Sequence, residues 1–513
     1  MWFPVYLLPL VSVNCANSLV LHGRRLAPRT GKGATFTATG SSNPWTNTTL
    51  TGTQDRYATN ITVSGQNFLV AIDTGSSDLW ISPKSHLTFT DSGINTSIIY
   101  ATSAVNGTIG FASVQVGPYG FSPQAFLVSS PDQVGLGGIL DENLDGLIGF
   151  GFDGTSESAI TLALGNSDTT VGQPFLFNMF DSSPDQENFI AISLSRTDDL
   201  EGSADASFTI NELDDTYAAV NTTPPIGITP PDGQRWMIPL DGITVNGNAV
   251  ALTPSKVAQT PTGKMAVLLD TGTPTAGVPT ELLNAIYGNI PRALYSASQK
   301  VWVVPCNTTA IVTLTFGGRP FPIHPLDLST IQTIEGVTVC TNAIAVFESD
   351  TAFDALFGDT IMRNVYSVFN FGSAIAKSPT RGSAIQLLSQ TNATTAIADV
   401  TNVRMATLAA SPPEGIPDSF QPLSFIQPPA VNAVALANGS SDESEEGQLQ
   451  KWAPIVIGLL GANLVILLVL VAIGVVMCVK RGGKSGARVN YTPVQFSESV
   501  PTAESCEEKR YSD

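Results

Sequence analysis

The sequence predicts an all-β, bilobal domain with few short helices, followed by one C-terminal transmembrane helix. Three observations lead to this prediction. Strand-and-turn patterning begins at Tyr57 and continues to about residue 390. Within it, an apolar run that ends in Asp-Thr-Gly occurs at Asp73 and again at Asp270, and the separation of 197 residues (270 − 73) is about the length of one lobe. Beyond it, residues 455–479 carry no charge and form an apolar run long enough to cross a bilayer.

The composition is that of a globular protein with an acidic surface. Of the 513 residues, 43% are hydrophobic, and the formal net charge is −19 at pH 7. Such a chain would repel the phosphates of a nucleic acid, so no nucleic-acid partner is expected. An acidic surface suits an acidic medium, and it is equally typical of secreted proteins in general. The charge therefore does not choose between these two interpretations.

The first residues are typical of a secretory protein. Residues 1–16 hold an apolar core that is too short to cross a bilayer, and small residues follow it, so a signal peptide is predicted. Residues 17–52 are basic in an otherwise acidic chain, and two interpretations stay open: an inhibitory pro-segment whose cations pair with an acidic cleft, or a leader without a role. Arg24 and Arg25 suit a dibasic processing enzyme. The basic residues of this leader are His22, Arg24, Arg25, Arg29 and Lys32.

The patterned region is predicted to form an N-terminal catalytic lobe at residues 53–225 and a C-terminal catalytic lobe at residues 226–390. Two Pro-Pro pairs near residues 221–235 indicate the connection between them. Helical patterning is scarce. Its best example is Thr280–Tyr287, where apolar residues recur at helical spacing and Thr280 is expected to cap the helix.

The composition changes after residue 390. Residues 391–451 are rich in Ala, Thr, Ser, Pro and Asn, and this favours a flexible, glycosylated stalk. Residues 452–479 are predicted to be a transmembrane helix, since the uncharged run within them is about 37 Å long at about 1.5 Å per residue. Lys480 and Arg481 follow the helix while the preceding side is acidic, which predicts a cytoplasmic tail at residues 480–513. The protein is therefore expected to be a single-pass type I membrane protein.

The cysteines and the glycosylation sequons agree with the secretory route. Of five cysteines, Cys15 lies in the leader, Cys478 in the apolar run and Cys506 in the tail. Cys306 and Cys340 remain as a pair in the globular part, where an oxidising compartment allows a disulfide. The glycosylation candidates ahead of the apolar run are Asn47, Asn60, Asn95, Asn106, Asn221, Asn307, Asn392 and Asn438.

The repeated Asp-Thr-Gly motif suggests acid–base chemistry by a pair of carboxyl groups. Two carboxylates a few ångströms apart cannot both ionise easily, so the pKa of one is raised and that of the other lowered, as is established for such dyads. The ionised member can take a proton from water, and the protonated member can donate one to a carbonyl oxygen. The titrations belong to the pair, so the acid role is assigned to neither Asp73 nor Asp270.

The two loops resemble those of the pepsin-like aspartic protease family, over about residues 55–385. In this family a later apolar strand that ends in glycine supports each loop, and Asp145–Gly149 and Ala355–Asp359 match those strands, with their aspartates expected to be structural. The resemblance implies that Asp73 and Asp270 are catalytic. The loop-supporting residues that it implies are Thr74, Gly75, Ser76, Thr271, Gly272 and Thr273. The sequon-rich, membrane-anchored layout is similar to that of fungal members.

Residues Ile98–Gly107 resemble the hairpin, or flap, that closes over the substrate in this family. The flap and pocket residues that the resemblance implies are Tyr100, Thr102 and Trp80, with a hydrogen bond between the tyrosine and the tryptophan. Spacing alone predicts the hairpin turn at Asn106-Gly107, whereas the resemblance places the tip at Ala101–Ser103. Ala101 and Ser103 stand where glycine is usual, which changes the expected shape of the pocket.

The resemblance implies an aspartic endopeptidase that hydrolyses extended polypeptide substrates at acid pH, through a water molecule activated by the Asp dyad. A monomer without a cofactor is expected. No metal site is expected either, because His22, His86 and His324 are isolated and outside metal-ligand spacing. The alternative is a catalytically inactive module with a protease fold that serves binding or surface adhesion. The retention of both aspartates argues against this alternative. The expected location is the secretory pathway, at the cell surface or in a vacuole or another acidic endomembrane compartment.

Overall fold

The computed structural model describes most of the region predicted to be globular. The described residues are 24–25, 34–40, 56–100, 103–117, 119–135, 139–152, 158–165, 172–181, 188–196, 199, 206–348, 352–372 and 382–426, and all of them lie in one compact unit within Met1–Asn432. The predicted signal peptide, transmembrane helix and tail lie outside them, as do most of the leader and the end of the stalk. Among the described residues, no helix is long and apolar enough to span a bilayer.

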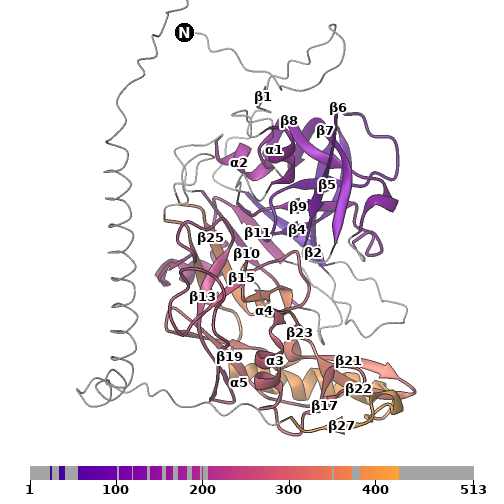
Figure 1. Ribbon diagram of the computed structural model, residues 1–513, viewed down its shortest axis with the longest axis vertical. Coiled ribbons are helices and arrows are strands. Elements are labelled where there is room, and N and C mark those ends of the chain that lie inside the picture. Colours follow the sequence, from indigo (N-terminus) through magenta and orange to yellow (C-terminus); the bar gives the residue numbers. More distant parts are fainter. Residues whose placement is uncertain are drawn as a thin grey trace, which may run out of the picture. The chain divides into compact units, whose positions relative to one another are not determined.

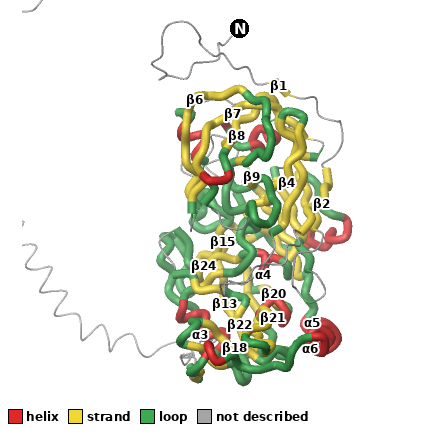
Figure 2. Tube along the Cα trace, turned by 90° about the vertical axis from the view of Figure 1, so that its right-hand side faces the viewer, coloured by secondary structure: helices red, strands yellow, loops and turns green. Residues whose placement is uncertain are grey.

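Strands dominate the described part of the chain, as the sequence predicts, and the α-helices are between four and eight residues long (Figure 2). The α-helices are α1 (Ala159–Ala163), α2 (Phe175–Phe180), α3 (Thr280–Tyr287), α4 (Asp359–Met362), α5 (Ala393–Asp399) and α6 (Met405–Ala410). The 3₁₀ helices are η1 (Pro131–Gln133), η3 (Asp215–Thr222), η4 (Pro325–Leu328) and η6 (Asp418–Phe420), and η5 (Val400–Arg404) is a π-helix.

A sheet of 14 strands runs through the first lobe and into the junction with the second (Figure 1). Its first-lobe strands are β3 (Tyr57–Val63), β4 (Gln66–Asp73), β5 (Leu79–Ile81), β6 (Thr90–Ile99), β7 (Ala104–Val116), β8 (Tyr119–Val128) and β9 (Gly146–Gly149). The junction strands are β2 (Ala34–Gly40), β10 (Phe189–Ser193), β11 (Ala206–Ile210), β12 (Ile226–Gly227), β25 (Val365–Asn370) and β26 (Ala384–Ser389). The short β1 (Arg24–Arg25) pairs with β8, so parts of the predicted leader join this sheet.

Two further sheets build the second lobe. The eight-stranded sheet contains β13 (Met237–Val245), β14 (Asn248–Val250), β15 (Met265–Leu269), β16 (Gly277–Val278), β19 (Val312–Phe316), β20 (Arg319–Ile323), β23 (Ala345–Val346) and β24 (Ala355–Phe357). The five-stranded sheet contains β17 (Leu294–Ser296), β18 (Val301–Val304), β21 (Ser329–Ile334), β22 (Val337–Asn342) and β27 (Leu423–Ser424).

The two lobes repeat one arrangement around the strand that carries each aspartate. In the first lobe β4 pairs in parallel with β9, and in the second β15 pairs in parallel with β24. A glycine ends β9 and another directly follows β24, and at each of them another chain segment passes closely. A Cβ on Gly149 would lie 2.4 Å from the carbonyl carbon of Ser77, and one on Gly358 would lie 2.0 Å from the carbonyl oxygen of Thr273. Only glycine permits these approaches, which explains the apolar–apolar–Gly pattern in the sequence.

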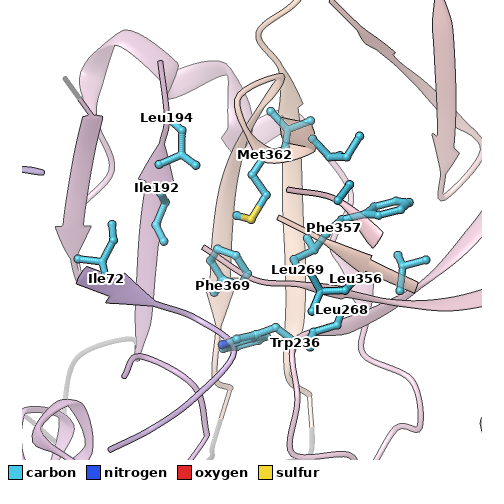
Figure 3. Packing of buried hydrophobic residues seen from close by; sticks show 14 of the residues in the cluster. Ile72, Ile192, Leu194, Trp236, Leu268, Leu269, Leu356, Phe357, Met362 and Phe369 are labelled. Atoms are coloured by element: carbon cyan, nitrogen blue, oxygen red, sulfur yellow. The ribbon is translucent and has the colours of Figure 1, made fainter. Parts of the chain in front are cut away.

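One hydrophobic cluster continues from the first lobe into the second (Figure 3). Trp236 is fully buried, and its ring centroid lies 4.3 Å from that of Phe152 in the first lobe and 4.6 Å from that of Phe371 beyond β25. Ile72, one residue before the first aspartate, and Leu269, one residue before the second, belong to the same cluster. The strands that lead to the two aspartates are thus anchored in shared, close-packed surroundings.

The predicted helix at Thr280–Tyr287 is confirmed as α3, but the predicted cap is wrong. The N-cap is Pro279, and the Thr280 hydroxyl donates to Glu348 at 2.6 Å instead of capping the helix. The helix is held by its apolar face, since Leu282, Leu283 and Ile286 are buried.

The predicted stalk begins too early. Residues 391–426 form α5, η5, α6, η6 and β27, and β27 pairs with β17 of the second lobe. Arg404 and Phe420 are each 1% exposed, and Arg404 forms an ion pair with Asp199 at 2.6 Å. Composition predicted disorder because this segment has little apolar surface of its own. The segment folds because it adds to a lobe that already exists, and it shares the core of that lobe.

Candidate active site

Asp73 and Asp270 lie at the ends of the two equivalent strands, and the fold brings them together. Asp73 ends β4 and Asp270 follows β15, and they are only 4% and 8% exposed. A Cβ on Gly75 would lie 2.6 Å from Cγ of Asp270, and a Cβ on Gly272 would lie 2.4 Å from Oδ1 of Asp73. Each carboxyl group therefore rests against the glycine of the opposite loop, which is a second reason for glycine at these positions.

The inner sides of the loops are joined by Thr74 and Thr271. The amide of each threonine donates to the hydroxyl oxygen of the other at 3.1 Å. The Thr74 hydroxyl donates to the Leu269 carbonyl at 2.9 Å, and the Thr271 hydroxyl donates to the Ile72 carbonyl at 3.0 Å. These four buried bonds fix one loop relative to the other.

The outer sides of the loops hold the carboxylates. The Gly75 amide donates to Oδ1 of Asp73 at 2.7 Å, and the Ser76 hydroxyl donates to its Oδ2. The second loop repeats both bonds: the Gly272 amide and the Thr273 hydroxyl each donate to Asp270 at 2.8 Å. Each carboxyl group thus has a fixed orientation, and each of its oxygens already accepts one hydrogen bond within its own loop.

Burial and mutual repulsion favour a bound proton on the pair of carboxyl groups formed by Asp73 and Asp270. Burial raises the pKa of Asp73 well above its ordinary value, and the charge of Asp270 and a hydrogen bond with it raise the pKa further. The hydrogen bonds from Ser76 and Gly75 act in the opposite direction but do not offset this rise. A pair with this balance keeps one proton at a pH where an isolated carboxyl group is ionised.

Tyr100, which follows β6 of the hairpin, lies near the first aspartate, and Trp80 of β5 is its hydrogen-bond partner. Nε1 of Trp80 donates to the Tyr100 hydroxyl at 2.9 Å, and Trp80 is fully buried. Burial raises the pKa of Tyr100 well above its ordinary value, and the charges of Asp73 and Asp78 add to the rise. The tyrosine is therefore a neutral hydrogen-bonding group throughout the acid and neutral range.

The hairpin of β6 and β7 turns where the resemblance places its tip, and the turn that spacing alone predicts is wrong. Ile99 pairs with Ala104, and the Tyr100 amide donates to the carbonyl of Ser103 at 2.8 Å. Asn106-Gly107 lies inside β7. Turn propensity failed here because Gly107 packs against the backbone of Val128, 2.2 Å from where its Cβ would be. Thr102, the other expected flap residue, lies outside the described residues.

Several buried charged groups beside the site were missed by the sequence patterns. Burial raises the pKa of Asp78 to about 6, against hydrogen bonds from Ser158, Ala159 and Ile160. Arg56 lies 2.6 Å from Glu142 and donates through Nε to the carbonyl of Gly272. These partners are between 80 and 216 residues apart in the sequence and follow no local motif, so no pattern in the chain could have paired them.

Asp145 and Asp359, which the resemblance treats as structural, have different surroundings. Asp145 accepts a hydrogen bond from the Leu69 amide at 3.0 Å and lies 2.9 Å from Lys84. Asp359 is fully buried at the start of α4, and its amide donates to the carbonyl of Thr273. Burial raises its pKa well above the ordinary value, while Arg363 lowers it and Asp270 raises it. Asp359 is thus electrostatically linked to the second aspartate.

The remaining predicted residues lie away from this centre. Cys306 and Cys340 form the predicted disulfide, with a sulfur–sulfur distance of 2.04 Å, which joins the segment after β18 to β22. Among the described residues, no group of three or more His, Cys, Asp or Glu side chains could hold a metal ion. Asn47 and Asn438 lie outside the described residues. The described sequon asparagines are all exposed: Asn60, Asn95, Asn106, Asn221, Asn307 and Asn392.

A two-lobed β fold in which each lobe delivers one Asp-Thr-Gly loop to a common centre defines the class of pepsin-like aspartic peptidases. The sequence model described as eukaryotic aspartyl protease matches residues 56–377, and the chain belongs to this family.

Known proteins of the same kind are similar to this chain at low identity. Major aspartyl peptidase 1 of Cryptococcus neoformans is 26% identical over 63% of this chain and 68% of that protein. The aspartic-type endopeptidase ctsD of Aspergillus fumigatus is 26% identical over 60% of this chain and 61% of that protein. Pepsin A of Rhinolophus ferrumequinum is 25% identical over 60% of this chain and 76% of that protein. The crystal structure of an aspartic proteinase from Irpex lacteus matches with a TM-score of 0.51 at 19% identity, covering 71% of this chain and 99% of that one, which supports the fold.

Proposed function

We propose that this protein is an aspartic endopeptidase in which Asp73 and Asp270 form the catalytic dyad. The observation that carries the proposal is the mutual placement of the two carboxyl groups, each buried against the opposite loop and each held by its own glycine amide and hydroxyl. Membership of a peptidase family makes peptide hydrolysis the reaction class that this geometry is expected to serve.

In the proposed mechanism the dyad carries one proton between its two carboxyl groups. The ionised carboxylate takes a proton from a water molecule, and the resulting hydroxide attacks the carbonyl carbon of the scissile peptide. The protonated carboxyl group donates its proton to the carbonyl oxygen, so the tetrahedral intermediate carries no net negative charge on that oxygen. The carboxyl group that took the proton from water then gives it to the leaving nitrogen as the C–N bond breaks, and the other carboxylate takes a hydroxyl proton from the intermediate, which restores the singly protonated pair. Activity requires the singly protonated pair, so it is expected in the acid range.

The proposed substrate is an extended stretch of polypeptide between the dyad and the hairpin of β6 and β7. Tyr100 and Trp80 would form one wall of the pocket for a side chain beside the cleaved bond, since their hydrogen bond fixes both rings near Asp73. Thr102 is proposed as a further contact from the hairpin tip. The hairpin would also limit the entry of water during the reaction.

The alternative is a module of the same fold that binds a partner or serves adhesion and does not turn over a substrate. The complete set of hydrogen bonds to both carboxyl groups favours the enzyme, because a binding module has no need for a proton-sharing pair.

We also propose the setting that the sequence predicts for the catalytic domain. A signal peptide at residues 1–16, exposed sequons and a transmembrane helix at residues 452–479 fit a monomeric enzyme of the secretory pathway. Glycan occupancy measured by mass spectrometry, and protease protection of residues 480–513 in sealed membranes, test this arrangement. An unmodified protein whose tail is cleaved from outside would contradict it.

The activity is tested on the full-length chain in mild detergent, with a quenched peptide library across the acid range and with Asp73→Asn and Asp270→Asn as matched variants. Cleavage at acid pH that pepstatin blocks and that both substitutions abolish is the expected result. No cleavage by the folded full-length chain, before or after limited proteolysis of the basic leader, would overturn the proposal and favour the binding module.

A further inference from the structure

Arg56 connects the first lobe to the loop that carries Asp270. It precedes β3, and its Nε donates to the carbonyl oxygen of Gly272 at 3.2 Å, across 216 residues of sequence. Its Nη1 lies 2.6 Å from Oε1 of Glu142, and the two side chains are 14% and 3% exposed. A guanidinium presents its N–H groups in fixed and divergent directions, so one arginine can hold the carbonyl and the carboxylate together. A lysine has a single nitrogen and cannot reproduce this geometry.

The residue that Arg56 holds touches both carboxyl groups of the site. The Gly272 amide donates to Oδ1 of Asp270 at 2.8 Å. The position of the missing Cβ of Gly272 is 2.4 Å from Oδ1 of Asp73. A displacement of this glycine would therefore change the hydrogen bonding of Asp270 and the space around Asp73 at the same time.

The charges of Arg56 and Glu142 act on the interior behind Asp270. Burial raises the pKa of Asp359, and Arg363 lowers it. The Asp270 charge raises it, Arg56 lowers it and Glu142 raises it again. The ion pair and Asp270 thus act on the same buried acid, where electrostatic interactions are weakly screened.

We propose that Arg56 is a positioning residue of the active site. Together with Glu142 it fixes the Gly272 carbonyl, and with it the Asp270 loop, across the boundary between the lobes. The opposite charges of the pair offset each other at the dyad, so the proton affinity of the dyad depends on both. This inference rests on the proposed function, in which Asp73 and Asp270 are catalytic.

The other titratable or charged groups that act on this region are Asp359 and Arg363 beside α4, Tyr100 at the hairpin and Asp78 after the first loop.

Charge-changing variants give opposite expectations. In Arg56→Gln the buried Glu142 keeps its negative charge, so both limbs of the pH profile of kcat/KM should move to higher pH. In Glu142→Gln the cation remains, and both limbs should move to lower pH. A shift of about 1.2 pH units is expected for one unit charge roughly 10 Å away at an effective dielectric constant of about 20. The double variant should return the limbs to the wild-type pH. Arg56→Lys keeps the charge but not the two-way contact, so it should lower kcat without moving the limbs.

A matched control is Lys264→Gln, which breaks the ion pair between Lys264 and Asp241. Lys264 precedes β15 and lies at the end of the strand away from Asp270, about 20 Å distant at about 3.3 Å per residue. This variant should move neither limb. Circular dichroism and thermal unfolding establish that each variant is folded. If Arg56→Gln does not fold, because it leaves Glu142 buried without this partner, Glu142→Gln and the double variant still decide the question.

A second readout separates this inference from the proposed function. The ¹³C titration of the aspartate carboxyl groups in the full-length chain, assigned with Asp73→Asn and Asp270→Asn, reports proton affinity without any turnover. Opposite shifts of the dyad titration in Arg56→Gln and Glu142→Gln would support the inference even if no peptide is cleaved. An active wild-type enzyme whose profile and titration are unchanged in both variants would overturn the inference and leave the proposed function standing.

Discussion

Thr74 and Thr271 exchange hydrogen bonds, with the backbone amide of each donating to the hydroxyl oxygen of the other at 3.1 Å. The two residues are 197 positions apart and belong to different lobes. Each hydroxyl also donates to the backbone carbonyl that precedes the aspartate of the opposite loop. The relative position of the two carboxyl groups is therefore determined by this exchange, which couples the stability of the lobe junction to the geometry of the site.

Thr74→Val tests this coupling. The substitution keeps the shape but leaves the Leu269 carbonyl and the Thr271 amide without a partner, so the free energy of unfolding should fall by about 2–4 kcal/mol. The value of kcat should fall with it, because the aspartates lose their alignment. Thr74→Ser retains the hydroxyl and should be close to the wild type. Urea unfolding and peptide turnover measure the two effects, and a stable, fully active Thr74→Val would contradict the coupling.

Asp78 should make the domain less stable as the pH rises. Its pKa is raised by burial from 3.8 to about 6, so its contribution is most favourable below pH 3.8 and is lost as the pH rises through about 6. Asp78→Asn removes this titration. Relative to the wild type, the variant should gain at most about 3 kcal/mol of unfolding free energy between pH 4 and pH 7. Chemical denaturation at the two pH values measures the difference, and a variant that shows no relative gain would be the contrary result.

Tyr100→Phe removes the hydroxyl that accepts the hydrogen bond from Trp80. The indole N–H is then buried without this partner, and the hairpin loses a fixed contact above the site. We expect kcat/KM for a peptide substrate to fall about tenfold, with a change in unfolding free energy of about 1 kcal/mol. Tyr295→Phe, in the five-stranded sheet, is the control for loss of a tyrosine hydroxyl. Equal effects of the two substitutions on kcat/KM would rule out a specific role for Tyr100.

The folded segment at residues 391–426 should be required for stability through Arg404. Its guanidinium is 1% exposed, pairs with Asp199 at 2.6 Å and donates to the Ser329 hydroxyl at 3.1 Å. Arg404→Met leaves Asp199 buried without this cation and should cost about 3–5 kcal/mol. Adding Asp199→Leu should restore much of this loss, since two apolar side chains replace the pair. Thermal unfolding of the single and double variants measures both steps, and an Arg404→Met chain as stable as the wild type would show that the segment is not anchored there.

Local patterns predicted much of the fold and the centre of the site, because the relevant contacts are short in sequence. An apolar run that ends in Asp-Thr-Gly describes a buried strand and the turn whose amide and hydroxyl hold its own aspartate, and all of these contacts fall within three residues. Helix α3 was equally visible, because helical periodicity is local. The hairpin tip was not, since Gly107 serves a close contact with Val128 and does not form a turn.

The sequence by itself determined that two equivalent strand-and-turn units exist, that each carries a carboxyl group and that Cys306 and Cys340 form the pair available for a disulfide. Only the tertiary structure decided which distant groups surround those carboxyl groups. The contacts of Arg56 with Gly272 and of Arg404 with Asp199 join residues more than 200 positions apart, and no periodicity or motif relates them. The same reason explains residues 391–426: their composition describes a segment in isolation, whereas their folding depends on a surface that the rest of the chain provides.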